Sequence, residues 1–160
     1  DKIKSFTENK VKRVLKEKGL LVINEYVGPT RLQFPKTQIQ KINEGLNLIP
    51  QKYKTRYLSN LSKGKYYGSG ILRMILADPS ECIDSESILP SIYTHFEKIV
   101  EKPFGGSILM TVLKDISHHF LELNDEKSQI LSDLFYFEDD YLKNHSSDFI
   151  FGVYQKNKDS

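Results

Sequence analysis

The apolar stretch at residues 148–154 constrains the fold of this chain more than any other feature. It is rich in β-branched and aromatic residues, which are typical of a strand. A single strand is not stable by itself in water, so this segment requires a partner. The β-prone residues 20–34, with the turn signal Gly28-Pro29 between them, form the candidate hairpin. The sequence therefore predicts a small antiparallel sheet that joins the two ends of the chain in one domain.

Elsewhere, apolar residues recur at the three- and four-residue spacing of amphipathic helices. Ser5 and Asn124 fit helix N-caps, and Gly19, Pro50 and Pro79 fit helix ends. We therefore expect a mainly α fold of about six to seven helices, with a small antiparallel β element made of the hairpin 20–34 and the C-terminal strand 148–154. The expected helices span residues 5–18, 37–49, 52–61, 71–77, 87–101, 107–123 and 124–142.

The length and composition favour one globular domain over residues 1–160. A chain of 160 residues, 39% of them hydrophobic, can bury a core without a metal ion or a disulfide. The chain begins without an initiator Met, which indicates a fragment of a larger protein or a processed chain. No apolar run approaches the length of a membrane span, so we expect no membrane partner. The single Cys82 excludes an internal disulfide and a cysteine zinc site, which favours an intracellular location.

Charge is distributed very unevenly along the chain. Residues 1–77 contain 16 Lys and Arg against 5 Asp and Glu, whereas residues 78–160 contain 7 Lys and Arg against 16 Asp and Glu. The net charges of the basic and acidic halves are therefore +11 and −9. Three interpretations follow: the basic half contacts a polyanion, the two halves meet within one fold or oligomer, or both halves are solvated faces.

The segment from residue 52 to residue 70 concentrates cations and tyrosines and contains no Asp or Glu. Binders of single-stranded nucleic acid combine cations for the backbone with aromatic rings for the bases. In the alternative interpretation, Tyr53 and Tyr57 pack in the core and the lysines are simply solvated. The predicted nucleic-acid contacts are Lys52, Lys54, Arg56, Lys63 and Lys65 for phosphates, and Tyr66 and Tyr67 for stacking.

A second constellation combines histidines and carboxylates. Asp115, His118, His119 and Glu122 have helical spacing, and the acidic residues 138–140 with His145 follow in the next helix. The pattern lacks the His-Glu-x-x-His and Glu-x-x-His signatures, and adjacent histidines diverge on a helix. We therefore favour surface acid–histidine pairs and predict no metal site, no catalytic residue and no cofactor.

The sequence favours a non-catalytic interaction domain whose cationic N-terminal half contacts nucleic acid or another polyanion within a larger assembly. The alternative is a module for protein–protein contact or self-association that uses the helical hairpin of residues 107–142. A small metal-dependent enzyme built on the histidine–carboxylate cluster is the least favoured class. Cys82 lies between Glu81 and Asp84, and such carboxylates disfavour a reactive thiolate.

Overall fold

The computed structural model describes residues 10–78 and 82–157. The chain divides into two compact units, each made of segments that are distant in sequence. Unit 1 comprises Asp1–Gln33, Ser69–Phe104 and Ser147–Ser160, and unit 2 comprises Phe34–Gly68 and Gly105–Ser146. The expected cap Ser5 lies outside the described residues. Within the described part of the chain, no helix is both long and apolar enough to cross a membrane.

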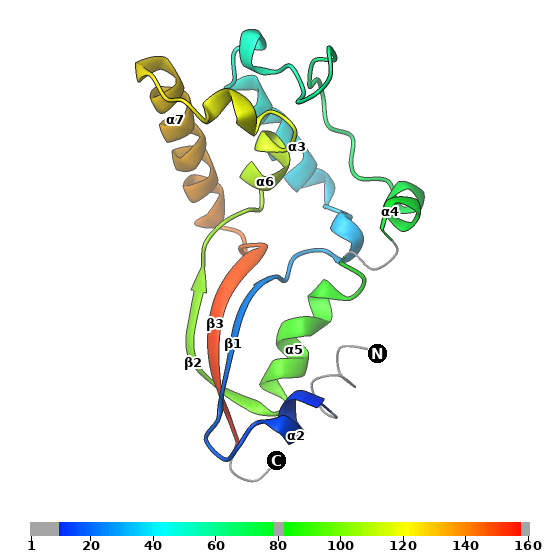
Figure 1. Cartoon of the computed structure of the whole chain (residues 1–160), viewed down its shortest axis with the longest axis vertical. Coiled ribbons are helices and arrows are strands. Elements are labelled where there is room, and N and C mark those ends of the chain that lie inside the picture. The colour runs from blue at the N-terminus through cyan, green and yellow to red at the C-terminus, as the bar shows by residue number, and fades with distance from the viewer. Residues whose placement is uncertain (1–9, 79–81, 158–160) are drawn as a thin grey trace. The chain divides into compact units, whose positions relative to one another are not determined.

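Unit 1 is built on a three-stranded antiparallel sheet in the order β1-β3-β2 (Figure 1). Strand β1 (Leu20–Tyr26) and strand β2 (Phe96–Pro103) both pair with the central strand β3 (Phe149–Lys156). The predicted C-terminal strand, and its pairing with the first β-prone segment, are thus confirmed.

One face of this sheet is covered by short helices. Helix α5 (Ile88–Tyr93) supplies Ile92 to a core shared with Phe96 and Tyr154, and residues of β1 and of the α2 region (Lys12–Val14) pack against that core. Tyr154 is fully buried. The short helix α4 (Ile71–Ala77), which the sequence predicts correctly, belongs to the same unit.

Unit 2 is helical. Helices α3 (Lys36–Asn47), α6 (Leu109–Leu113) and α7 (Asp125–Leu142) bury Ile42, Val112 and Leu134 between them. Asn124 caps α7 as predicted, because its side chain accepts a hydrogen bond from the Lys127 N–H at 2.9 Å.

The expectation of a mainly α fold is wrong. The chain is 45% helical and 17% strand, which makes it a mixed α/β protein. The expected helix over residues 87–101 ends at Tyr93, and its second half becomes β2. Phe96, Ile99 and Val100 are compatible with either state, and the second edge of β3 selects the strand because it offers a ladder of backbone partners.

The second limb of the expected hairpin 20–34 is also wrong. Residues Thr30–Leu32 form a 3₁₀ turn, η2, in which Arg31 has φ 57°. The Arg31 N–H donates to the Cys82 carbonyl at 2.7 Å instead of joining a ladder with β1. Strand β1 therefore pairs with the C-terminal strand β3 and not with residues 30–34.

Two expected helices of unit 2 are shorter than the sequence predicts. The helix over residues 107–123 is interrupted after α6, where Lys114 is extended and Asp115 has φ 66°. The chain resumes as the 3₁₀ turn η5 (Ser117–Phe120). Residues 52–61 contain only the 3₁₀ turn η3 (Gln51–Tyr53), followed by a loop closed by an isolated bridge between Thr55 and Ser62.

Candidate anion-binding pocket

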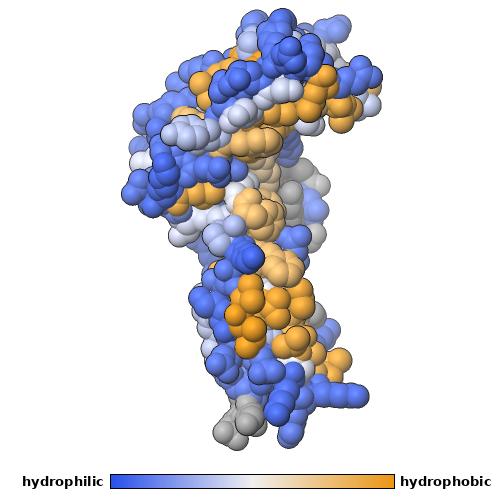
Figure 2. All heavy atoms as spheres, turned by 90° about the vertical axis from the view of Figure 1, so that its left-hand side faces the viewer, coloured by the Kyte–Doolittle hydropathy of each residue, from blue (hydrophilic) through white to orange (hydrophobic). Residues whose placement is uncertain are grey.

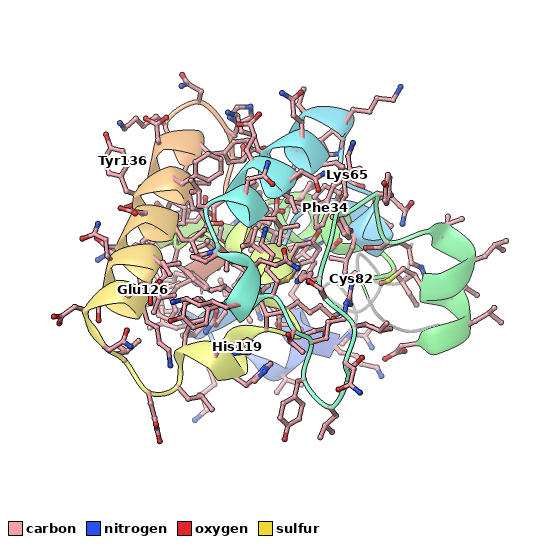
Figure 3. All side chains as sticks on the ribbon, turned by 90° about the horizontal axis from the view of Figure 1, so that it is seen from above. Phe34, Lys65, Cys82, His119, Glu126 and Tyr136 are labelled. Atoms are coloured by element: carbon pink, nitrogen blue, oxygen red, sulfur yellow. The ribbon has the colours of Figure 1, made fainter. Side chains whose placement is uncertain are left out.

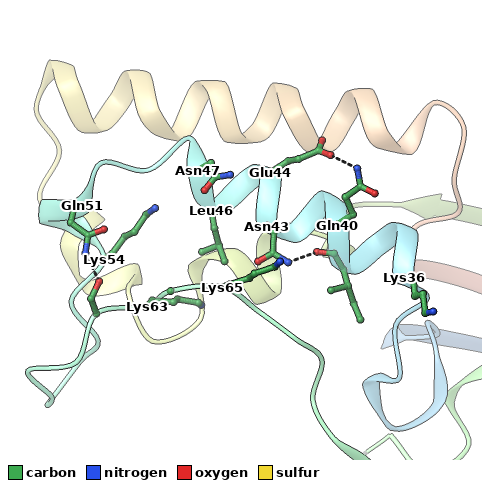
Figure 4. Close-up of a pocket in the computed structure, with 13 residues that line it drawn as sticks. Lys36, Gln40, Asn43, Glu44, Leu46, Asn47, Gln51, Lys54, Lys63 and Lys65 are labelled. Carbon is green, nitrogen blue, oxygen red and sulfur yellow. Dashed lines mark hydrogen bonds between the residues drawn. The ribbon is translucent and has the colours of Figure 1, made fainter.

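Unit 2 contains a pocket of about 830 Å³ between helix α3 and the segment that follows η3 (Figure 4). Four of its thirteen lining residues are lysines, and one is a carboxylate. It is formed by Lys36, Ile39, Gln40, Asn43, Glu44, Leu46, Asn47, Gln51, Lys54, Ser62, Lys63, Gly64 and Lys65.

Helix α3 supplies one wall through a polar stripe. Lys36, Gln40, Asn43 and Asn47 follow one another at spacings of four, three and four residues, so they share one side of the helix. The opposite side carries Ile42, which is fully buried in the core. The amphipathic pattern of α3 thus directs amide and ammonium groups toward the pocket.

Asn43 fixes the second wall against the first. Its side-chain amide donates to the Tyr66 carbonyl at 2.9 Å, and its side-chain oxygen accepts from the Tyr66 N–H at 2.8 Å. The Tyr66 ring lies 6.4 Å from the Phe34 ring, centroid to centroid. These contacts hold the strand-like segment beside α3, so the pocket is bounded by fixed backbone on both sides.

Among the four lysines that line the pocket, Lys63 is the buried one. Its ammonium group donates to the Thr111 carbonyl at 2.6 Å and to the Lys114 carbonyl, and its side chain is buried. Burial lowers the pKa of Lys63 to about 8, although the nearby charge of Asp115 opposes this shift. Lys63 therefore anchors the loop to the end of α6 and contributes positive charge at the base of the pocket.

Lys54 and Lys65 are the two predicted phosphate contacts that line the pocket without being buried. Lys54 is half-buried and Lys65 is exposed, and both line the pocket. The Lys65 ammonium lies 5.6 Å from the centre of the Tyr67 ring, and Tyr67 is 81% exposed. A cation and an exposed aromatic face thus stand side by side next to the pocket.

Lys52 and Arg56 lie outside the pocket and have carboxylate partners. The Lys52 ammonium lies 2.7 Å from an oxygen of Glu126, and the Arg56 guanidinium lies 2.9 Å from an Asp115 oxygen. Glu126 is labelled on helix α7 in Figure 3. Both pairs join the basic half of the sequence to the acidic half. Unit 2 combines residues 34–68, with seven Lys and Arg against one Glu, and residues 105–146, with three Lys against eight Asp and Glu. The two halves therefore meet within this unit.

One carboxylate, Glu44, is found in the pocket lining. It accepts hydrogen bonds from Lys41 at 2.6 Å and from Gln40 at 3.0 Å. The hydrogen bond from Lys41 lowers the pKa of Glu44, so this carboxylate is ionised and already balanced by a cation. The lysines of the pocket consequently keep most of their attraction for an external anion.

The histidine–carboxylate constellation does not converge on a point. Asp115 is bonded to Arg56, and His119 Nε2 lies 2.8 Å from the Thr55 carbonyl. The rings of His118 and His119 are 4.0 Å apart, centroid to centroid, so the divergence expected of adjacent histidines on a helix is not observed. Within residues 10–78 and 82–157, no three His, Cys, Asp or Glu side chains are placed to hold one metal ion.

The acidic residues 138–140 divide between two environments. Glu138 is buried and accepts from the N–H groups of Ile108 and Leu109, at 2.7 and 3.0 Å. It also accepts from the Gly106 N–H at 3.1 Å, so it caps the start of α6. Asp140 instead pairs with Lys143 on the surface, at 3.0 Å. Glu138 is therefore a structural residue.

The apolar stripe on which the 107–142 alternative depends is only partly buried within unit 2, because Leu121 and Phe135 are 81% and 52% exposed. Ile108, Val112 and Ile116 have no exposed surface, and Phe120 is 8% exposed. These side chains form the core with α3 and α7 and are not available to a partner in this conformation.

The site predicted from the sequence does not include the contribution of α3 to the pocket. Its pocket residues, Lys36, Gln40, Asn43 and Asn47, lie outside the dense cluster of cations and tyrosines at residues 52–70 that predicts the site. The signal was the regular spacing of amides opposite the apolar face, which is visible in the sequence of α3.

Comparison with known proteins gives no relative for this chain: no family model, curated protein or solved structure matches it.

Proposed function

We propose that the protein is a non-catalytic interaction domain that binds a single nucleic-acid strand at the pocket of unit 2. The observation that carries the proposal is that Lys36, Lys54 and Lys65, from two separate segments, line one pocket in which Glu44, the one lining carboxylate among the described residues, is bonded to Lys41. Phosphates are attracted to such a cluster by charge, independently of sequence.

The other lining groups suit the remaining parts of a nucleotide. Gln40, Asn47 and Gln51 carry amides, which can donate to and accept from base edges. Tyr67 offers an exposed ring for base stacking, which contributes about 1–3 kcal/mol per base in proteins of this class. Single strands expose both base edges and ring faces, and this favours them over a duplex as the ligand.

Lys52 and Arg56 have a secondary role in this proposal. Their ion pairs are exposed, with 59% and 41% of the cationic side chains accessible. Exposed pairs contribute about 0–1 kcal/mol, so a phosphate can compete with Glu126 and Asp115 for these cations. Lys63 stays bonded to its two carbonyls and acts through its charge alone.

The test is fluorescence anisotropy with labelled single-stranded oligonucleotides over a salt series. We expect affinity to fall steeply with salt, and each of Lys36→Ala, Lys54→Ala and Lys65→Ala to lower the slope of log affinity against log salt by about 0.7. Tyr67→Ala should weaken binding about tenfold with an unchanged slope.

Two variants serve as matched controls. Lys143→Ala removes an exposed lysine at the C-cap of α7, and Tyr136→Ala removes a 70% exposed tyrosine of that helix. Neither residue lines the pocket, so neither should alter binding. Absence of binding at low salt, or equal effects of the pocket and control variants, would refute the proposal.

A further inference from the structure

The sheet of unit 1 has one covered face and one apolar face that is open to solvent. Side chains that alternate with the buried Tyr154 point to the open face. Figure 2, which views the molecule from the β2 side, shows apolar side chains gathered over the sheet in its lower half. The exposed apolar residues of this region are Leu20, Val22, Ile99, Val100, Phe104 and Phe151, each 37–56% exposed.

The register of the strands places a continuous apolar row across the middle of this face. Val22 of β1 is opposite Val153 of β3, and Val153 is opposite Val100 of β2. The ladder between β2 and β3 shifts between Lys98 and Val100, so Ile99 is an extra residue beside this row. The bulge therefore widens the apolar surface at the β2 edge.

Charges of opposite sign lie on the two sides of this row. On one side of the valine row, Glu97 of β2 pairs with Gln155 of β3. On the other side, Lys102 of β2 pairs with Phe151 of β3. Both are exposed, and neither has an ion-pair partner among the described residues. On the opposite face of the sheet, by contrast, Glu101 is bonded to Tyr93 and Tyr154.

We propose that this face binds the same face of a second copy of the chain. The two-fold axis runs parallel to the row Val22, Val153 and Val100 and lies midway between the two sheets. Such an axis places β2 over β2 with the strands antiparallel. Glu97 of each copy then faces Lys102 of the other copy, and the valine row faces itself.

Charge complementarity is the reason for choosing a second copy as the occupant. In an isologous interface, the same surface of both copies must be complementary to itself. An acid and a base at equal distances on either side of an apolar row meet this condition, because the two-fold rotation places the acid of one copy opposite the base of the other. Aligned packing of two sheets is also the ordinary way to cover an apolar sheet face. The surface belongs to unit 1 and is independent of the pocket in unit 2.

The experiment is analytical ultracentrifugation of the full chain up to about 1 mM. We expect a reversible dimer, and loss of that dimer in Val22→Asp. Val22 is 56% exposed, so this variant should fold, which circular dichroism will check. A monomer at every concentration would overturn the proposal.

A reciprocal charge swap tests the register. Glu97→Lys and Lys102→Glu should each weaken the dimer about tenfold, because each creates like-charge contacts across the axis. The double variant carrying both changes should restore the affinity of the native chain. Glu25→Lys makes the same change in charge on the sheet but not on this face, so it should have no effect. Failure of the double variant to recover, or an equal effect of Glu25→Lys, would overturn the proposed geometry.

Discussion

Each of the two units contains an ionisable group that links distant segments, and the two groups are of opposite charge type. In unit 1, the Glu101 carboxylate accepts hydrogen bonds from Tyr93 and Tyr154, at 2.5 and 2.7 Å. In unit 2, the Lys63 ammonium donates to two backbone carbonyls. Each group ties together segments that are about 50 residues or more apart in the sequence.

The two groups differ in the type of hydrogen-bond partner that each one has. The carboxylate of unit 1 has side-chain donors, and its partners acquire raised pKa values: that of Tyr93 rises to about 12, and that of Tyr154 rises further, through burial and the hydrogen bond to Glu101. The ammonium of unit 2 has only neutral carbonyl partners, and burial lowers its pKa. The two units should therefore respond to alkaline pH with opposite sign.

The largest expected effect tests the packing behind the Glu101 network. An Ala side chain at Gly152 would place its Cβ 2.4 Å from Tyr154 Cε2, and the Tyr154 ring is fully buried and bonded to Glu101. We expect Gly152→Ala to lower the free energy of unfolding by about 3 kcal/mol, because the ring has no space to move. Urea denaturation measures the change.

The control for this variant is Gly64→Ala in unit 2, where an added Cβ meets no atom within 4 Å. It should change stability by less than about 0.5 kcal/mol. Equal effects at Gly152 and Gly64 would show that the ring of Tyr154 is not fixed as described.

The next effect concerns Lys63 and pH. Its pKa is about 8 in the folded chain and 10.5 in the unfolded chain, so the unfolded state binds more protons between these values. Stability should therefore rise with pH in this window, by about 2 kcal/mol between pH 8 and pH 10. The measurement compares urea unfolding of the native chain and of Lys63→Met across that range. A constant difference between the two would mean that the amine does not titrate there.

Local signals explain which parts of this architecture the sequence predicted. The cap at Asn124 and the apolar strand at residues 149–156 depend on neighbours within a few positions, and both were predicted correctly. Strand β2 was missed because Phe96, Ile99 and Val100 also continue a helical stripe, and the competing edge of β3 lies about 50 residues away. The positive φ of Asp115, which ends the α6 region, has no local sequence signal.

The candidate site was predictable to a similar extent. The predicted site follows the density of cations from Lys52 to Lys65, and three residues of this segment, Lys54, Lys63 and Lys65, line one pocket. Nothing local distinguished Lys63, because its burial depends on carbonyls at Thr111 and Lys114. The carboxylate partners of Lys52 and Arg56 are likewise distant in sequence.

A smaller effect is expected at Tyr154. Tyr154→Phe removes one donor to Glu101, but the Tyr93 hydroxyl at 2.5 Å remains. We expect a loss of about 1 kcal/mol at pH 7. Because the pKa of Tyr154 is raised, the folded state retains a proton that the unfolded state loses above pH 10, so its contribution to stability falls as pH rises. The Phe variant should show a shallower loss of stability above pH 10, whereas Tyr136→Phe on the surface should match the native chain.

The smallest effect is expected at the surface pair of Lys52 and Glu126. The Lys52 ammonium and the Tyr53 hydroxyl both donate to Glu126, at 2.7 and 2.9 Å, yet the side chains of the ion pair are 59% and 44% exposed. Water and salt weaken such a pair, so a double-mutant cycle with Lys52→Ala and Glu126→Ala should give a small coupling that falls as salt is added. A coupling above about 2 kcal/mol would be typical of a buried pair. It would also contradict the idea that Lys52 can exchange Glu126 for a phosphate, because the phosphate would then have to replace a strong internal partner.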